Sequence, residues 1–158
     1  MSNLYFCKYF PETVDEDNFL LPDAKPQWNP SRDIILTHVY LDLDVELEAK
    51  KLAGRAKITF SSIKKDLQSI FLDCCELQIK EVTSEKGQRL EFRQNDRGVK
   101  IYLAESMSRD QSDTINLDYQ VEEPRLGLYF TGPDEDYPDK LWQLWSQGQD
   151  EDNKYWFP

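Results

Sequence analysis

The chain has 158 residues, of which 39% are hydrophobic and 13% aromatic, enough to build the core of one domain but not of two. Its 30 acidic and 19 basic residues give a formal charge of −11, which repels nucleic acid and the anionic face of a membrane. We therefore expect a single soluble domain with no nucleic-acid partner and no membrane partner.

Sequence features that report on the cellular compartment favour the cytoplasm. The first residues lack the sustained apolar run of a secretion signal, and no apolar stretch approaches the ~20 residues of a membrane-spanning helix. The chain has three cysteines, and two of them, Cys74 and Cys75, are adjacent. An odd count with this spacing does not form a disulfide framework, so we expect thiols in a reducing compartment.

Residues 1–33 have an irregular composition. Four prolines fall within this stretch, and each removes a backbone donor and disfavours a helix or a central strand. The same stretch carries nine large apolar side chains, more than is typical of a disordered tail, which is the alternative interpretation. We expect residues 1–33 to form an extended N-terminal arm that packs on the domain.

Residues 41–48 show the clearest periodicity in the chain, because apolar and acidic side chains alternate strictly. Such alternation places all apolar side chains on one face of a half-buried strand. A similar alternation recurs over residues 52–60, after a turn near residues 49–51. The pattern predicts a long antiparallel hairpin, in which acidic outer positions of the first strand face Arg55 and Lys57 on the second.

Further short strands are predicted at intervals along the chain, with turn-forming residues between them. No stretch has a sustained helical period. The predicted fold class is all-β, an antiparallel β-sandwich or saddle. Beyond residue 122, prolines and glycines break an aromatic-rich segment into turns. The predicted strands are Ser69–Asp73, Gln78–Thr83, Arg89–Arg93, Val99–Leu103 and Asp113–Val121.

The chain does not carry the motifs of a catalytic site. A hydrolytic zinc site needs three protein ligands, whereas His38 is the single histidine and neither HExxH nor CxxC occurs. There is no GxSxG, P-loop or GxGxxG motif either. Two acidic runs, residues 134–136 and 150–152, lack the spacing of a calcium loop and are interpreted as solvated loop charge. From its residues alone, the chain is an acidic β domain without a metal ligand set.

Three motifs toward the C-terminal end nevertheless form a specific pattern. Gly127-Leu128-Tyr129-Phe130 is followed by Ser146-Gln147-Gly148-Gln149 and then by Phe157-Pro158. This order resembles the N-terminal domain of the aminopeptidase N family of zinc peptidases, which shows G-[LIM]-Y-F, then [TS]-Q-x-[EQ], then [FY]-P. The hairpin that includes residues 38–45 is similar to the opening hairpin of that family, so the resemblance extends from about Ile34 onward.

The resemblance implies a saddle-shaped domain, residues 34–158, that caps a thermolysin-like catalytic domain of the same polypeptide. The family's GxMEN and HExxH motifs lie downstream of the position equivalent to Pro158 and do not occur here. We therefore expect a cytoplasmic zinc aminopeptidase whose zinc ligands lie outside this chain, and we expect the chain alone to be inactive. The large apolar residues at its end agree with a domain cut before the catalytic domain.

The resemblance also assigns a role to two glutamines. The fourth position of [TS]-Q-x-[EQ], here Gln149, is expected to bind the free α-amino group of the peptide substrate, and Gln147 to support it or line the pocket. Without the resemblance, both glutamines are more simply interpreted as residues that satisfy loop backbone groups. The rival function is a free-standing β-sandwich interaction module, whose aromatic C-terminal segment binds a protein partner.

Overall fold

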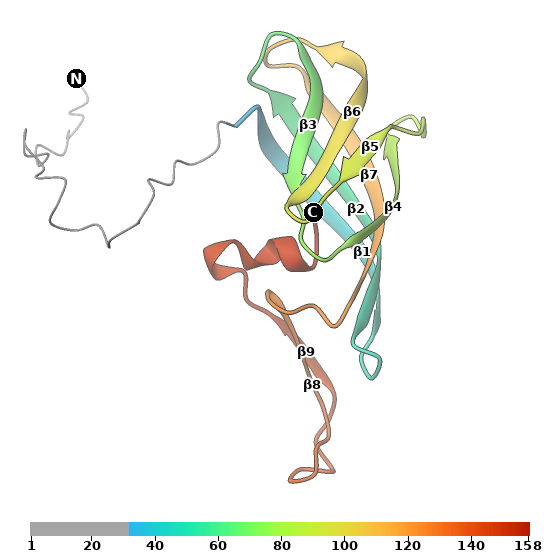
Figure 1. The fold of residues 1–158 in the computed structure, drawn as a ribbon, viewed down its shortest axis with the longest axis vertical. Coiled ribbons are helices and arrows are strands. Elements are labelled where there is room, and N and C mark those ends of the chain that lie inside the picture. The colour runs from blue at the N-terminus through green and yellow to red at the C-terminus, as the bar shows by residue number, and fades with distance from the viewer. Residues whose placement is uncertain (1–31) are drawn as a thin grey trace, which may run out of the picture. The chain divides into compact units, whose positions relative to one another are not determined.

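A computed structural model describes residues 32–158 (Figure 1). The predicted N-terminal arm, residues 1–33, therefore lies outside the described residues except for its last two positions. The all-β antiparallel fold class is confirmed, since strands make up most of the described part and every strand pair in it is antiparallel. None of its helical segments has the length and apolar character to cross a membrane. The elements are β1 (Ile34–Glu46), β2 (Lys51–Ser62), β3 (Leu67–Asp73), β4 (Gln78–Ser84), β5 (Phe92–Gln94), β6 (Gly98–Met107), β7 (Ser112–Glu122), β8 (Leu128–Thr131), β9 (Gln143–Ser146) and the 3-10 segment η1 (Gln149–Tyr155).

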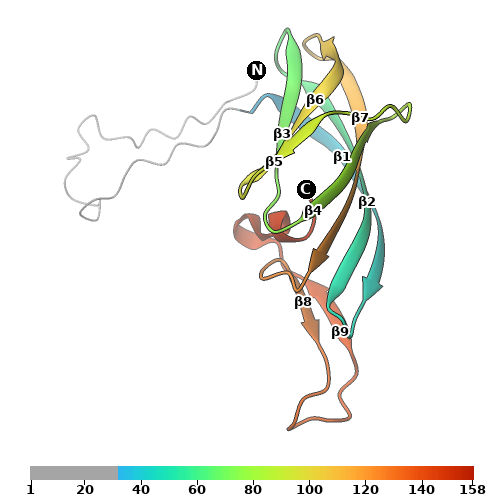
Figure 2. The ribbon, with the colours of Figure 1, turned by 45° about the vertical axis from the view of Figure 1, so that its right-hand side comes forward.

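Two sheets form the body of the domain. A four-stranded sheet has the order β1-β2-β7-β4, and a three-stranded sheet with the order β3-β6-β5 lies against it (Figures 1 and 2). Their facing sides share one apolar core, which fits the alternation of buried and exposed residues along the central strands. The side chains buried most completely include Phe60, Ile58, Ile70, Ile101, Ile115 and Leu117.

The hairpin predicted from the periodicity is formed by β1 and β2. Leu41 pairs with Ala56 and Val45 with Leu52 in antiparallel register, and the turn closes through the Lys50 N–H and the Leu47 carbonyl, 3.2 Å apart. Strand β2 lies between β1 and β7, and its apolar side chains on the core face, Leu52, Ala56, Ile58 and Phe60, are buried. Strand β1 is an edge strand, in which Leu41 and Leu43 are half-buried as predicted, whereas Val45 stays 39% exposed.

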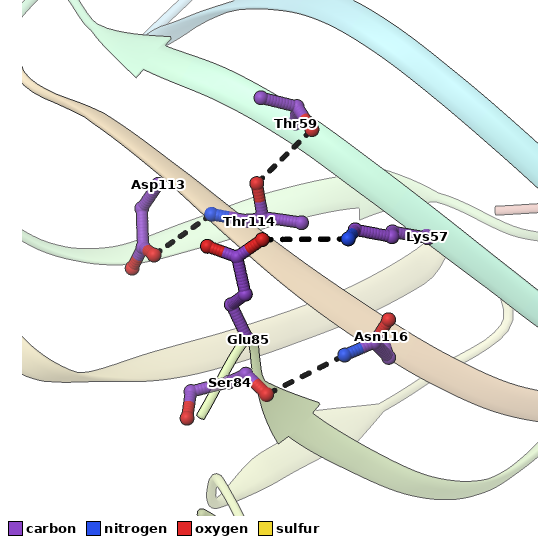
Figure 3. A network of polar contacts seen from close by, with 7 residues as sticks. All are labelled: Lys57, Thr59, Ser84, Glu85, Asp113, Thr114 and Asn116. Carbon is purple, nitrogen blue, oxygen red and sulfur yellow. Dashed lines mark hydrogen bonds and ion pairs between the residues drawn. The ribbon is translucent and has the colours of Figure 1, made fainter. Parts of the chain in front are cut away.

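Arg55 and Lys57 on β2 do not pair with the acidic side chains of β1 that the sequence suggested. Arg55 lies opposite Asp42 in the β1–β2 register, but its guanidinium forms two hydrogen bonds with the Asp118 carboxylate on β7, at 2.6 and 2.8 Å. Lys57 reaches Glu85, with 3.3 Å between Nζ and Oε1 (Figure 3). Because β2 has a neighbouring strand on each side, the alternation along β2 does not predict which of the two strands its outer side chains contact.

A polar network lies on the face of the four-stranded sheet that carries Lys57 (Figure 3). The hydroxyls of Thr59 and Thr114 lie 3.0 Å apart across β2 and β7. The Asn116 amide donates to the Ser84 carbonyl at 3.4 Å, which ties β7 to the end of β4. These contacts fix the register of the central strands, and each contributes a modest amount of stability.

Several strand bounds differ from the predicted ones. Strand β5 covers residues 92–94 instead of 89–93, because Arg89 makes only an isolated bridge to Thr83 on β4. Strand β6 continues to Met107, well past the predicted end at Leu103, and it pairs with both β3 and β5. The two C-terminal strands, β8 and β9, were not predicted at all.

Candidate functional site

The motif that carries the two glutamines begins at the end of a hairpin. Strands β8 and β9 pair antiparallel, so that Leu128 lies opposite Ser146 and Tyr129 opposite Trp145. The rings of Tyr129 and Trp145 stack with 4.4 Å between centroids and 19° between planes. The prolines and glycines of this region predicted turns instead, and residues 132–142 separate the two strands in sequence. The hairpin places residue 147 directly beside Gly127.

Gln147 and Gln149 lie together just after β9, and both side chains are exposed. The Gln147 N–H donates to the Gly127 carbonyl at 2.9 Å, and its side-chain Oε1 accepts the Gln149 N–H at 3.3 Å. Within residues 32–158, the Gln149 carboxamide itself makes no hydrogen bond. Gln147 therefore supports the turn through its amide oxygen, while the Gln149 side chain is available to a ligand.

The segment that follows is fastened to the sandwich at a second point. The Cys75 N–H, after β3, donates to the Lys154 carbonyl at 2.7 Å. Arg125 donates to the Tyr155 hydroxyl at 3.1 Å and pairs with Glu76 at 3.2 Å, so one guanidinium joins the β7–β8 link, the β3–β4 link and η1. Its Cζ also lies 5.1 Å from the centroid of the Tyr155 ring. These contacts hold η1 against the three-stranded sheet side of the domain.

The aromatic residues at the end of the chain are less exposed than the sequence suggested. Trp156 and Phe157 are half-buried, pack against the core and meet edge to face at 4.6 Å between ring centroids. The exposed apolar side chains of this region instead belong to the β8–β9 hairpin and its loop. They are Tyr137 at 68%, Leu141 at 78% and Trp145 at 51% exposure.

The described residues do not fit a zinc site. No group of three His, Cys, Asp or Glu side chains converges within residues 32–158. His38 is exposed on β1, and Cys74 is buried, which raises the pKa of its thiol to about 12. A thiol with this pKa remains protonated at neutral pH and is a poor metal ligand.

The acidic runs behave as loop charge. The Asp134 carboxylate accepts the N–H groups of Asp136 and Tyr137, at 3.1 and 2.8 Å, and so stabilises its own turn. Glu151 pairs with Lys154 at 3.4 Å on the exposed side of η1. Neither run gathers its carboxylates around a common point within the described part of the chain.

Together, the fold and this segment define an antiparallel β domain that ends in an anchored, glutamine-bearing turn. The chain belongs to the Peptidase M1 N-terminal domain family, whose sequence model matches residues 36–158. No curated protein matches the chain by sequence.

Solved structures of M1 enzymes share the fold. The M1 zinc metallopeptidase of Deinococcus radiodurans is 18% identical, with a TM-score of 0.63 over 80% of this chain and 29% of its own. A mutant of that enzyme with a bound Tyr-Ser-Ala substrate is 22% identical, with a TM-score of 0.53 over 60% of this chain and 22% of its own. Native yeast LTA4 hydrolase is 17% identical, with a TM-score of 0.65 over 87% of this chain and 23% of its own. This chain thus spans less than a third of the length of these relatives.

The comparisons support an N-terminal domain of an M1 metallopeptidase, a family of zinc hydrolases. The narrower assignment to the aminopeptidase N family stays a prediction.

Proposed function

We propose that residues 34–158 form the non-catalytic N-terminal domain of a cytoplasmic zinc aminopeptidase of the aminopeptidase N type. In this proposal the domain caps the active cleft, and Gln149 binds the free α-amino group of the peptide substrate. The observation that carries the proposal is the Gln149 carboxamide, which is exposed at the fourth position of Ser146-Gln147-Gly148-Gln149 and makes no hydrogen bond within residues 32–158.

The chemistry of a glutamine suits this role. Its amide oxygen accepts a hydrogen bond from an ammonium group, while a carboxylate elsewhere in the site provides the main charge pairing. The backbone of Gln149 is held by Gln147, so its side chain needs little reorganisation to bind. One structural relative was solved with a Tyr-Ser-Ala substrate, which supports a peptide as the substrate class.

The zinc of the proposed enzyme belongs to a catalytic domain in the same polypeptide, since the described residues offer no ligand set for it. We propose that this domain covers the exposed apolar side chains of the β8–β9 hairpin, Tyr137, Leu141 and Trp145. On this reasoning the 158-residue chain alone has no peptidase activity and retains no zinc after dialysis against a chelator.

The alternative function, a free-standing interaction module, uses the same apolar hairpin to bind a separate protein. The two functions differ in what must lie in the same polypeptide. An HExxH motif encoded downstream of Pro158 supports the aminopeptidase, and an interaction module needs none.

Steady-state kinetics of the enzyme that contains the catalytic domain tests the role of Gln149. Replacement by Ala removes a hydrogen bond to a charged group, worth about 1.5–3 kcal/mol. We expect Gln149→Ala to lower kcat/KM for peptides with a free N-terminus by about tenfold to more than a hundredfold, with unchanged zinc content. Gln149→Glu strengthens ground-state attraction for the ammonium group and is expected to lower KM without raising kcat.

Gln143→Ala is the matched control, because Gln143 is an exposed glutamine on β9, outside the motif. It should leave kcat/KM unchanged. If wild type and both Gln149 variants have the same kcat/KM and discriminate equally between free and N-acetylated peptides, Gln149 is only a loop residue and the proposed function is wrong.

A further inference from the structure

The backbone immediately after Gln149 has an uncommon conformation. Asp150 and Glu151 have φ angles of 58° and 72°, so two consecutive residues with side chains lie in the left-handed region. L-residues adopt this region reluctantly, and such conformations persist only where the surrounding structure holds them. The turn that carries Gln149 must therefore be held in place by contacts with neighbouring residues.

Asn153 provides such contacts, both with the residue before Gln149 and with the residues at the end of the segment. Its carboxamide packs directly against Gly148, where a Cβ atom would come within 2.5 Å of Nδ2 and 2.6 Å of Cγ. In the other direction, its Oδ1 accepts the Trp156 indole N–H at 3.2 Å. Its backbone carbonyl accepts the N–H groups of Trp156 and Phe157 at 3.0 and 3.1 Å.

These contacts connect the residue before Gln149 to the apolar core. Trp156 packs against the core, and Asn153 joins it through one side-chain and one backbone hydrogen bond. Gly148 precedes Gln149 and leaves room for the Asn153 carboxamide only because it has no side chain. A displacement of Asn153 thus removes the packing partner of Gly148 and leaves the backbone of Gln149 held by the Gln147 side chain.

We infer that Asn153 is a positioning residue, which sets the direction of the Gln149 side chain through Gly148 while Trp156 anchors it to the core. This inference rests on the proposed role of Gln149 in binding the substrate α-amino group. Asn153 itself does not touch the substrate. Its contribution is to keep the Gln149 carboxamide oriented before the peptide arrives, and small displacements of a binding group have large effects on rate.

The test is a set of kinetic cycles in the enzyme that contains the catalytic domain. Asn153→Ala should lower kcat/KM for a free-N-terminus peptide by about tenfold, together with the discrimination against the N-acetylated peptide. Because Asn153 acts through Gln149, the Asn153→Ala/Gln149→Ala double variant should be no more than about twofold worse than Gln149→Ala alone. Asn153→Asp keeps the Oδ1 acceptor and the shape of the side chain, so it should restore activity to within about threefold of wild type.

A second cycle uses the packing contact. Gly148→Ala forces its new methyl group into the Asn153 carboxamide and should lower kcat/KM to a similar extent. Adding Asn153→Ala to Gly148→Ala removes the overlap, so the double variant should be less impaired than the product of the two single effects. The Gly148→Ala single variant and the Asn153→Asp variant provide a result even if Asn153→Ala does not fold.

The outcomes separate the inference from the function on which it rests. If Gln149→Ala leaves kcat/KM unchanged, the proposed function is wrong. If Gln149→Ala impairs the enzyme but the effects of Asn153→Ala and Gln149→Ala multiply, or Asn153→Ala reduces kcat equally for free and blocked peptides, Asn153 serves stability alone and the positioning role is refuted. In the 158-residue chain, the assigned Trp156 indole N–H resonance should move upfield in Asn153→Ala but not in Asn153→Asp, where a carboxylate oxygen still accepts the hydrogen bond; an unchanged resonance in Asn153→Ala also overturns the inference.

Discussion

Gly127, just before β8, packs tightly against the C-terminal segment. Its φ angle is 80°, and an added Cβ would overlap the Asp152 carbonyl oxygen and lie 2.9 Å from Cδ1 of Trp156. Gly127→Ala therefore combines two penalties. A left-handed alanine costs about 1–2 kcal/mol, and the forced displacement of packed atoms costs about 1–3 kcal/mol more.

Gly87 offers a control that carries only the first penalty. Its φ angle is also 80°, but no atom lies within 4 Å of the position that a Cβ would occupy. We expect Gly87→Ala to lower the free energy of unfolding by about 1–2 kcal/mol and Gly127→Ala to lower it by about 2–5 kcal/mol. The gain from a stiffer unfolded chain is the same in both variants and cancels in their difference.

The measurement is urea denaturation of the 158-residue chain, followed by tryptophan fluorescence, with limited proteolysis of the native state alongside it. If Gly127→Ala detaches the segment instead of unfolding the whole domain, proteolytic cleavage within residues 147–157 accelerates while the urea midpoint changes less. Equal midpoints for the two alanine variants, with unchanged cleavage at 147–157, would refute the close packing of the segment on Gly127 and with it the anchored turn.

Two further predictions concern the sheets. Tyr119 is 2% exposed and its hydroxyl has no partner within the described residues, so Tyr119→Phe should raise the free energy of unfolding by about 1 kcal/mol; a loss of similar size would show that the hydroxyl is bonded. The hydrogen bonds from Arg55 hold the pKa of Asp118 in the folded protein below its ordinary value of 3.8. The Arg55–Asp118 pair therefore stabilises the fold at pH values above 3.8, and this stabilisation is lost as the pH falls through the folded-state pKa. Asp118→Asn should therefore cost about 0.5–1 kcal/mol at pH 7 in urea denaturation, and the difference from wild type should shrink below about pH 4; a difference that persists undiminished at pH 2 would contradict the ionic origin.

Sequence periodicity predicted the first hairpin because the feature is local. Strict alternation over residues 41–48 and 52–60, with a turn between them, favours one antiparallel register, in which the alternating apolar side chains of both strands lie on the same face. The strands β3, β4, β6 and β7 were predicted as short strands between turn-forming residues, with differences at their ends. What alternation did not supply was the partner of each outer side chain, so Arg55 was expected to face the acidic side chains of β1 although it bonds to Asp118.

The sequence motifs also located the candidate site, since the order of Gly127-Leu128-Tyr129-Phe130, Ser146-Gln147-Gly148-Gln149 and Phe157-Pro158 led to the M1 N-terminal domain family. The assignment of Gln149 and Gln147 to substrate binding came from that resemblance and stays a prediction.

The sequence by itself determined the elements whose signal lies within a few neighbouring residues: alternating strands, their tight turns and the glutamine motif. Only the tertiary structure decided the β8–β9 pairing across residues 132–142 and the burial of Trp156 and Phe157. It also decided how Gly127 and Asn153 surround the turn that carries Gln149. These contacts join residues that are far apart in the sequence and that come together only in the folded domain. They could not be predicted from the sequence, because hydrophobic periodicity shows which face of a strand is buried but not which residues cover that face.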